Sequence, residues 1–393
     1  MTPAARVQAA IEVLDLVIAA ARANGAPADR LIADWFRSRR FAGSGDRRAV
    51  RDLVYRAIRL CGEVPETGRA AMVRLAQDDA ALAALFDGSR HAPAPLEHGE
   101  PVAGAGVAPR WLEERLAASG VSGRDAEALL DRAPLDLRVN TLKAARDGVA
   151  LPVAAEEGIA RSSLRLPHGT QVDQWPAYLS GQIEVQDASS QLTCDVVGAR
   201  AGEAVIDLCA GAGGKTLALA AAMDGRGTLI ACDTDRPRLS RLGPRAERAG
   251  AAALIDTVLL NPNREHEALA DWVGRADAVL VDAPCSGTGT WRRNPEARWR
   301  LTEAQLARYA AIQSRLLDLA ATLVAPGGRL VFVTCSLLDA EGADQVAAFL
   351  ARHPGWQNVP TGLAAGTPRG GGTRLSPAHD GTDGFFVARL EMS

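Results

Sequence analysis

The stretch VIDLCAGAGGKT, residues 205–216, decides the fold class. It begins with an apolar run typical of a buried strand, continues as a glycine-rich turn, and leads into residues 217–222, which read as a helix. A strand, a turn and a helix in this order are typical of nucleotide sites in open parallel sheets. Gly211, Gly213 and Gly214 let a ligand come close to the backbone, so we expect a cofactor loop here.

Similar apolar runs recur along the C-terminal half and alternate with helical stretches rich in alanine and leucine. These runs cover residues 204–208, 228–232, 278–281 and 329–333. Short apolar strands with helical crossovers predict an α/β protein with a doubly wound, Rossmann-like sheet covered on both faces. A last apolar run, residues 384–390, is expected to form an antiparallel strand at the edge of this sheet.

The 393-residue chain is long enough for two or three domains. Residues 1–88 show the three- and four-residue apolar spacing of helices and predict an all-α domain. Residues 89–109 are rich in Pro, Gly and Ala and predict a linker, after which residues 110–181 predict a small helical and α/β module. The sheet domain then occupies residues 182–393.

Composition narrows the class of protein. The net charge of −3 argues against a protein that coats nucleic acid over its whole surface. No run of about 18 uncharged apolar residues occurs, so we expect a cytoplasmic protein without a signal peptide or a membrane span. The six cysteines form no C-x-x-C pair, which predicts neither a zinc site nor a disulfide framework. We expect no metal and, by default, a monomer.

The acid at the end of the next predicted strand, Asp233, lies near the spacing at which a carboxylate meets ribose hydroxyls. A P-loop ATPase is the nearest alternative, because Gly214-Lys215-Thr216 matches the end of its motif and Asp282 follows an apolar strand as a magnesium-binding acid would. Cys209 stands where that motif requires its first glycine, which disfavours the ATPase.

Two cysteines stand directly after predicted strands. Cys285 lies in DAPCSGTG, residues 282–289, and Cys335 lies between Thr334 and Ser336, so both should reach the sheet edge where ligands bind. Paired thiols suit methylation of cytosine carbon 5, because a thiolate must add to carbon 6 and a base must later remove the carbon 5 proton. A carboxyl group would hydrogen-bond the ring at nitrogen 3, and Asp282 is placed for this. Three other cysteines are interpreted as small buried residues, namely Cys194, Cys209 and Cys232.

These motifs resemble those of the Sun-type RNA (cytosine-5)-methyltransferases over nearly the whole chain. They are RVNTL (138–142), EVQD (184–187) with SQ (190–191), the 207–216 loop, the 282–289 turn, RRNP (292–295), APGG (325–328) with TCS (334–336), and DGFF (383–386). The resemblance implies that Cys335 bonds covalently to cytosine, Cys285 assists product release and Asp282 contacts the base. It also implies that S-adenosylmethionine is the cofactor, held by Cys209, Ala210, Gly211, Ala212, Gly213, Gly214, Lys215, Asp233, Arg238, Asn261 and Asp282.

The resemblance further implies an RNA partner, with small-subunit ribosomal RNA expected and transfer RNA left open. Residues 1–88 would be a NusB-like RNA-binding domain, whose arginine-rich segment 37–59 is either a phosphate-binding surface or a solvated helix face. The residues expected to contact RNA are Arg47, Arg48, Arg51, Arg292, Arg293 and Trp299. A non-catalytic RNA-binding assembly factor is the alternative from another class, and the intact cysteine pair with its aspartate disfavours it.

The chain departs from the family pattern at three places. One is the cofactor loop, which has Gly211-Ala212 where alanine and proline are common, and this difference should matter little. The segment QDASSQ, residues 186–191, lacks an acid that is common in the family. The segment LLNPN, residues 259–263, lacks the acid that usually faces the adenine, so Asn261 or Asn263 would take its place through an amide hydrogen bond.

Lys215 is one of only two lysines among 44 basic residues. We hypothesise that it lies near the thiolates, where it lowers a cysteine pKa or orients the base. A capping or packing role in the loop is the alternative.

Overall fold

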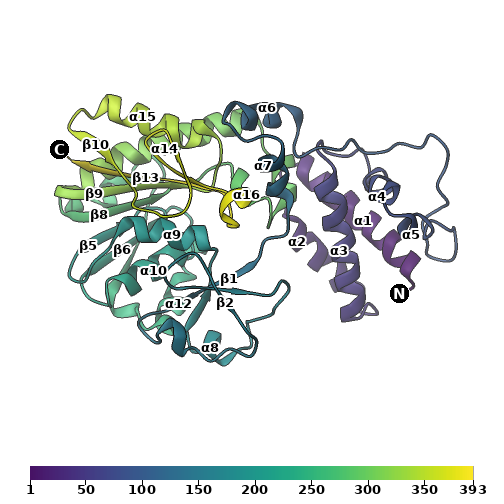
Figure 1. Cartoon of the computed structure of the whole chain (residues 1–393), viewed down its shortest axis with the longest axis horizontal. Coiled ribbons are helices and arrows are strands. Elements are labelled where there is room, and N and C mark those ends of the chain that lie inside the picture. Colours follow the sequence, from purple (N-terminus) through teal and green to yellow (C-terminus); the bar gives the residue numbers. More distant parts are fainter. Residues whose placement is uncertain (393) are drawn as a thin grey trace. The chain divides into compact units, whose positions relative to one another are not determined.

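The computed structural model describes residues 1–392 and separates into two compact units (Figure 1). The first unit is helical and comprises Met1–Asp131 together with Thr290–Thr302. The second unit comprises Arg132–Gly289 and residues 303–392. This division differs from the predicted boundaries, because residues 110–131 and a short piece of the predicted sheet domain both belong to the helical unit.

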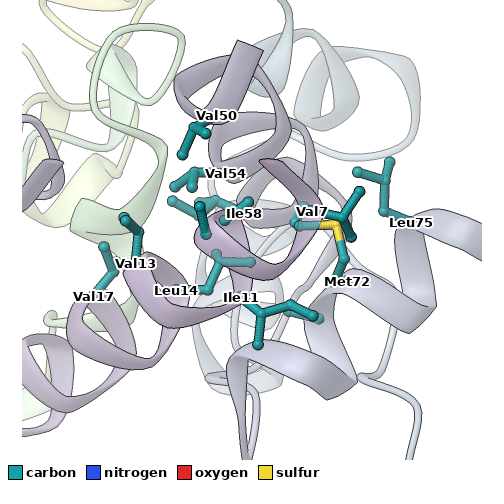
Figure 2. Packing of buried hydrophobic residues seen from close by; sticks show 14 of the residues in the cluster. Val7, Ile11, Val13, Leu14, Val17, Val50, Val54, Ile58, Met72 and Leu75 are labelled. Carbon is teal, nitrogen blue, oxygen red and sulfur yellow. The ribbon is translucent and has the colours of Figure 1, made fainter. Parts of the chain in front are cut away.

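Helices build the first unit, which confirms the predicted helical character of the N-terminal part. They are α1 (Pro3–Arg22), α2 (Ala28–Arg37), α3 (Ser44–Leu60), α4 (Gly68–Gln77), α5 (Ala80–Ala83), α6 (Arg110–Ala118) and α7 (Arg124–Glu127). Thr2 caps α1 by accepting a hydrogen bond from the Ala5 amide. Apolar side chains of α1, α3 and α4 meet in the core shown in Figure 2, where Leu14, Val54 and Met72 are fully buried. No helix within residues 1–392 is long and apolar enough to cross a membrane.

The predicted linker lies along the helices of its own unit. The Ala103 amide donates to the Ala70 carbonyl at 3.2 Å, and Arg69 forms an ion pair with Glu100 at 2.7 Å. Residues 89–109 therefore connect two parts of one compact unit rather than two domains. Composition could not reveal this, because the stretch is attached largely through backbone groups and a single ion pair.

The segment Thr290–Thr302 completes the first unit and contains the short helix η6 (Pro295–Trp299). Glu296 accepts a hydrogen bond from the first amide of α2 at 2.9 Å, so its carboxylate caps that helix. Arg298 is fully buried and donates to two backbone carbonyls at the end of α3, at 2.6 and 2.8 Å. The chain that follows the Cys285 turn is therefore part of the helical core.

The second unit begins with a small antiparallel sheet in the order β2-β3-β1-β4. Its strands are β1 (Leu135–Val139), β2 (Glu156–Glu157), β3 (Ser163–Leu166) and β4 (Ile183–Val185), and α8 (Pro176–Leu179) precedes β4. Leu137 and Val139 of β1 pack with Ile183 of β4 in a small core. Because β4 pairs with β1, this sheet extends past the predicted end of the module at residue 181.

The large sheet has nine strands in the order β11-β12-β13-β9-β8-β5-β6-β7, with β10 paired to β13. Its strands are β5 (Ala204–Asp207), β6 (Thr228–Asp233), β7 (Ile255–Leu259), β8 (Ala276–Asp282), β9 (Val324–Thr334), β10 (Trp356–Val359), β11 (Thr367–Arg369), β12 (Gly372–Leu375) and β13 (Phe385–Met392). The neighbours from β7 across to β9 run parallel, as predicted.

Helices cover both faces of this sheet. They are α9 (Ala188–Val197), α10 (Gly214–Ala222), α11 (Arg236–Leu239), α12 (Leu242–Ala249), α13 (Glu265–Ala268), α14 (Glu303–Leu323), α15 (Ala343–Arg352) and α16 (Pro377–Asp380). Val205 of β5 packs with α9, α10 and α12, whereas the next residue, Ile206, packs with α14 and α15 on the opposite face (Figure 1). The doubly wound, Rossmann-like class is confirmed.

The C-terminal strand β13 pairs antiparallel with β9, as predicted, but it does not form the edge of the sheet. β12 and β10 pair with β13 on its other side, and β11 follows β12. The prediction of an edge strand is therefore wrong. The added strands are short, and β11 is largely exposed, so they carry no apolar run that a sequence pattern could reveal.

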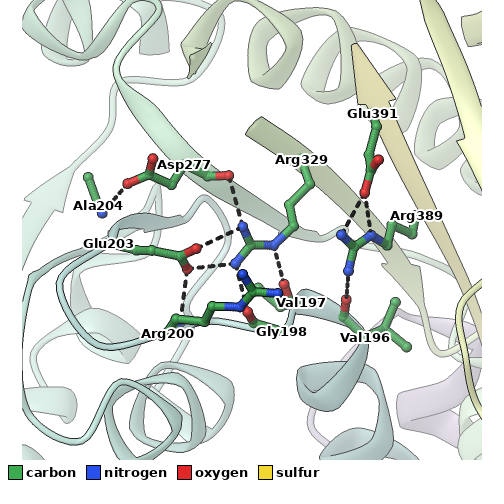
Figure 3. A network of polar contacts seen from close by, with 10 residues as sticks. All are labelled: Val196, Val197, Gly198, Arg200, Glu203, Ala204, Asp277, Arg329, Arg389 and Glu391. Carbon is green, nitrogen blue, oxygen red and sulfur yellow. Dashed lines mark hydrogen bonds and ion pairs between the residues drawn. The ribbon is translucent and has the colours of Figure 1, made fainter. Parts of the chain in front are cut away.

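At the amino-terminal end of the parallel strands, Arg329 of β9 contacts Glu203 and the end of α9 (Figure 3). Its guanidinium forms an ion pair with Glu203 at 2.6 Å and donates to the carbonyls of Val197 and Gly198. These carbonyls end α9 and would otherwise lack a partner. This end of the sheet is closed by structural contacts, whereas the functional groups gather at the other end.

Candidate active site

The carboxyl ends of four parallel strands carry the polar residues singled out from the sequence. β5 ends at Asp207, β6 at Asp233 and β8 at Asp282, and Cys335 directly follows β9. A cavity of about 840 Å³ lies at this edge, and its walls include Leu208, Cys209, Asp233, Asp235, Arg238, Leu260, Asn263, Glu265, Asp282, Cys285, Arg308, Ile312, Arg315 and Cys335. Segments far apart in the chain therefore share one site.

The glycine-rich loop is fastened to the end of β6. The Gly211 amide donates to Asp233 Oδ2 at 2.7 Å, and the Asp235 amide donates to Asp233 Oδ1 at 2.7 Å. Gly213 has a φ of 85°, and a β-carbon there would lie 2.1 Å from the Leu242 side chain, so this turn requires glycine. Asp233 thus orders the loop and still has lone pairs for ligand hydroxyls.

Lys215 lies in the first turn of α10 and reaches the end of β8. Its Nζ lies 2.7 Å from Asp282 Oδ2 and 5.2 Å from the centre of the Phe385 ring. Burial acts to lower the pKa of Lys215, but the charge of Asp282 and the hydrogen bond to its carboxylate favour the charged amine, and the net shift is upward. Lys215 is therefore a charged partner that fixes the Asp282 carboxylate.

The two cysteines meet at the edge of the sheet. Cys285 Sγ and Cys335 Sγ lie 3.3 Å apart, within hydrogen-bonding distance for sulfur. The Gly289 amide donates to the Cys335 carbonyl at 3.0 Å, and the Gly384 amide donates to the Gly289 carbonyl at 2.8 Å, so backbone bonds hold the turns together. The hydrogen bond to Cys335, together with burial, raises the pKa of Cys285 well above its ordinary value. Cys285 therefore keeps its proton at neutral pH.

Comparison with known proteins identifies the family. Residues 196–391 match the family model described as 16S rRNA methyltransferase RsmB/F. The ribosomal RNA small subunit methyltransferase B of Xylella fastidiosa is 37% identical over 295 residues, which cover 72% of this chain and 68% of that protein. The chain belongs to the RsmB/F family. The protein of the same name from Citrobacter koseri is 36% identical over 292 residues, which are 72% of this chain but 66% of that relative's length.

Solved structures agree with an RsmB/F fold. The crystal structure of PH0851 superposes with a TM-score of 0.75 at 26% identity, and the match covers 100% of this chain and 99% of that one. A methyltransferase homologue from Pyrococcus horikoshii gives a TM-score of 0.59 at 25% identity over 72% of this chain and 99% of its own. The family assignment removes the P-loop ATPase as an alternative.

Four of the cofactor residues expected in this RsmB/F protein line the cavity, namely Cys209, Asp233, Arg238 and Asp282. The others of the loop, Ala210, Gly211, Ala212, Gly213, Gly214 and Lys215, form the turn between β5 and α10 and the start of that helix. The loop residues therefore shape the site, while the strand ends supply its walls.

The two candidates for the adenine contact lie at different places. Both are exposed, but Asn261 accepts a backbone hydrogen bond from the Arg264 amide, whereas Asn263, at a φ of 66°, lies in the cavity wall with Glu265. The left-handed backbone at Asn263 redirects the chain between β7 and α13, and spacing alone could not reveal this turn. Of the two candidates, the structure therefore favours Asn263 over Asn261.

The residues predicted to contact RNA divide into two groups. Those on α3 are exposed, namely Arg47, Arg48 and Arg51. Trp299 is 5% exposed and its Nε1 donates to two backbone carbonyls after α3, and Arg292 is 7% exposed. Burial in the helical unit contradicts the predicted RNA contact of Trp299 and Arg292. Arg293 is half-buried, so its contact stays a prediction.

Sequence reasoning missed the side chains that α14 and the turn after β9 bring to this RsmB/F site. Arg308, Ile312 and Arg315 of α14 line the cavity, and Arg315 pairs with Glu265 at 2.6 Å. Glu341 is fully buried and hydrogen-bonds the Cys285 turn. The helical spacing of the α14 residues marks one face of a helix, but nothing in the sequence connects that face with the cysteines.

Of the three cysteines interpreted from the sequence as small buried residues, two agree with that interpretation and Cys209 agrees only in part. Cys194 and Cys232 are buried, and burial raises the pKa of Cys194 to about 12. Cys209 also lines the cavity, so it is more than a core residue. Among residues 1–392, no three His, Cys, Asp or Glu side chains are grouped so that they could hold a metal ion.

Asp207 is a buried carboxyl group beneath the cofactor loop, and its pKa can be tested through the pH dependence of stability. It is fully buried, accepts one hydrogen bond from Thr216 Oγ1 at 2.7 Å, and its Oδ1 has no hydrogen-bond partner within residues 1–392. Burial is the largest cause that raises its pKa to about 7, and the nearby charge of Asp282 adds to it. Between pH 4 and 7 the folded state therefore holds a proton that the unfolded state releases, and the free energy of unfolding should fall as pH rises.

Replacing Asp207 by Asn should remove the part of the pH dependence of stability that comes from Asp207, because a side-chain amide stays neutral at every pH. We expect Asp207→Asn to gain stability relative to the natural protein between pH 5 and pH 8, by at most about 4 kcal/mol. Urea unfolding of both proteins at the two pH values measures the difference. Parallel pH profiles would show that Asp207 is ionised in the folded protein throughout.

Proposed function

We propose that this protein transfers a methyl group from S-adenosylmethionine to carbon 5 of a cytosine in RNA, with small-subunit ribosomal RNA as substrate. The proposal rests on the 3.3 Å separation of the Cys285 and Cys335 sulfur atoms in the same cavity wall as Asp233 and Asp282. The name of the relatives, ribosomal RNA small subunit methyltransferase B, supports ribosomal over transfer RNA. Such a substrate implies a cytoplasmic enzyme.

The residues of the cavity fit S-adenosylmethionine. Its volume of about 840 Å³ lies within the range of small-molecule pockets. Asp233 suits the ribose hydroxyls, Asn263 suits the adenine amino group, and Leu260 and Ile312 offer apolar contacts to the adenine ring. The carboxylate of Asp282 suits the positively charged end of the cofactor. When bound, the cofactor supplies an electrophilic methyl group.

The two thiols would act in sequence on the cytosine. The Cys335 thiolate forms a bond to carbon 6, which makes carbon 5 electron-rich enough to accept the methyl group. A base then removes the carbon 5 proton, the electrons of that bond restore the ring double bond, and the bond from carbon 6 to Cys335 breaks. Cys285 keeps its proton and lies 3.3 Å from the departing sulfur, so its S–H can stabilise the thiolate that leaves.

Lys215 would act through Asp282. The 2.7 Å ion pair fixes one carboxylate oxygen, which leaves the other for ring nitrogen 3 of the cytosine or for the cofactor. Of the two roles hypothesised for Lys215, this is the one in which it orients the base, and not the one in which it lowers a cysteine pKa. A Lys215→Arg enzyme with unchanged turnover would contradict it, because a guanidinium has a different donor geometry and length.

Methyl transfer can be measured directly. The protein is incubated with small-subunit ribosomal RNA and S-adenosylmethionine carrying a labelled methyl group, and the RNA is digested to nucleosides for mass spectrometry. We expect the label in 5-methylcytidine. Transfer RNA is the matched alternative substrate. Label in another nucleoside, or in neither RNA with a folded protein, would contradict the proposed reaction.

We also propose that α3 forms an RNA-binding surface of a NusB-like domain. Arg47, Arg48 and Arg51 are exposed on this helix. Arg47 lies 5.5 Å from the centre of the Phe36 ring, and Arg51 lies 5.5 Å from that of Tyr55, so two guanidinium groups stack near aromatic rings and keep polar edges for phosphates.

Replacing Arg47, Arg48 and Arg51 together by Ala should weaken RNA binding and flatten its salt dependence. Each lost phosphate contact reduces the slope of log K against log salt by about 0.7–0.9, so the triple variant should lose about 2. Filter binding at several salt concentrations measures this. A triple replacement of the exposed Arg30, Arg110 and Arg226 is the charge-matched control. Equal slopes for the two triple variants would leave α3 an ordinary solvated face.

A further inference from the structure

Glu341 is a buried carboxylate beside the cysteine pair. It lies in the short helix η7 (Asp339–Glu341), which follows the Cys335 turn, and its exposed fraction is 0%. Its carboxylate accepts hydrogen bonds from the Ser286 amide at 2.8 Å, from the Ser286 hydroxyl, and from Gln313 Nε2 at 3.2 Å. One side chain thus joins the Cys285 turn, the segment after Cys335, and α14.

The serines that follow the two cysteines extend this network. Ser286 Oγ lies 3.2 Å from Ser336 Oγ, and Thr288 Oγ1 lies 3.1 Å from Ser336 Oγ. Thr288 Oγ1 also accepts from the Leu337 amide at 2.9 Å. Each cysteine is therefore adjacent in sequence to a serine whose hydroxyl is held by the other turn. The spacing of the two sulfur atoms follows from this anchoring.

The network also places a buried carboxylate directly against the Cys285 turn. The hydrogen-bond partners of the Glu341 carboxylate are neutral groups, namely an amide, a hydroxyl and a side-chain amide. Glu341 is among the groups that raise the pKa of Cys285, after the Cys335 hydrogen bond and burial, whereas the cation Lys215 interacts with Cys335. Tyr309 of α14 interacts electrostatically with the two thiols and Glu341, and burial is the largest cause that raises its own pKa.

We propose that Glu341 is a positioning residue that locks the two cysteine turns together and disfavours a thiolate at Cys285, so that Cys335 is the nucleophile of the pair. This inference rests on the proposed function, in which one of the two thiols attacks the cytosine. Its test, however, measures only the reactivity of the two thiols in the protein without RNA or cofactor. Two thiols in contact could exchange roles, and an asymmetric buried charge is a physical reason why they would not.

The test compares alkylation of the two cysteines without RNA or cofactor. Initial rates of iodoacetamide modification at pH 7.5 are read for the Cys285 and Cys335 peptides by mass spectrometry, because the thiolate is the reacting form. In the natural protein Cys335 should react faster. In Glu341→Gln, which keeps the shape and removes the charge, the ratio of the two rates should fall by about tenfold, the equivalent of one pKa unit.

The matched control is Glu203→Gln, which removes a carboxylate from an ion pair with Arg329 at the far end of the same sheet (Figure 3). It should leave the alkylation ratio unchanged. A folded Glu341→Gln protein with the natural ratio would overturn the inference. If this variant does not fold, the natural protein decides instead. Cys335 should then be alkylated faster than Cys285, and a Cys285 rate equal to or above that of Cys335 would refute the proposal.

Failure of this inference and failure of the proposed function can be distinguished. An unchanged alkylation ratio, with normal 5-methylcytidine formation by the natural protein, would remove only the role of Glu341. If Glu341→Gln changes the alkylation ratio but the natural protein methylates no RNA, the difference between the two thiols would stand and the proposed reaction would be wrong.

Discussion

Cys285→Ala protein incubated with RNA and S-adenosylmethionine should appear on a denaturing gel as a slowly migrating protein–RNA band. Cys335 would still add to cytosine carbon 6 and the methyl group would still be transferred, but the sulfur would leave slowly without the S–H group that lies 3.3 Å away. We expect turnover to fall by about 10²–10⁴-fold, the usual loss when a proton-donating or proton-accepting group is removed. The covalent product should therefore accumulate.

The double replacement of Cys285 and Cys335 by Ala should abolish the band, because the bond to the RNA requires the Cys335 sulfur. Cys61→Ala is the matched control, since Cys61 is a buried cysteine of the first unit. It should neither trap RNA nor lose turnover. Methyl transfer that survives in Cys335→Ala would show that the nucleophile is another group, and a band formed through Cys285 would show that the two roles are reversed.

Replacing Arg298 by Met should destabilise the helical unit by about 2–5 kcal/mol. The guanidinium is fully buried and donates to the carbonyls of Ile58 and Cys61 at 2.6 and 2.8 Å, and also to the Pro295 carbonyl. Burial lowers its pKa to about 9, so the group stays charged at neutral pH. Methionine fills much of the same volume but removes the hydrogen bonds that the guanidinium donates to these carbonyls.

Urea unfolding followed by tryptophan fluorescence measures the effect, because Trp35, Trp291 and Trp299 all lie in this unit. Arg110→Met is the matched control, since the Arg110 side chain is 89% exposed, and it should change stability by about 0.5 kcal/mol or less. Equal unfolding midpoints for the two variants would mean that η6 contributes little to the helical core.

The local part of the site could be predicted from the sequence. The loop at residues 205–216 and the two cysteine turns are contiguous segments, and each follows an apolar run whose strand character depends on neighbours in the chain. Because parallel strands end at one edge, the meeting of Cys285 and Cys335 could be expected before any coordinates, and it is confirmed. Their chemical roles stay predictions.

Contacts across long stretches of chain decided the rest. Arg292 and Trp299 follow the Cys285 turn in the chain, and the resemblance to the Sun-type family implied that they face RNA. Packing against α1 and α3 buries this segment in the helical unit instead. Likewise, β10, β11 and β12 form because β13 offers a free edge, and not because their own residues favour strands.

The sequence by itself determined the parallel sheet, the cofactor loop and the identity of the paired thiols, since periodicity and turn residues act over a few positions. Only the tertiary structure decided which side chains surround them. Glu341 beside Cys285, Asn263 and Glu265 in the cavity wall, and Lys215 against Asp282 all depend on how distant elements pack. A buried charge or hydrogen bond acts through space, so its partner is defined by the fold and not by spacing along the chain.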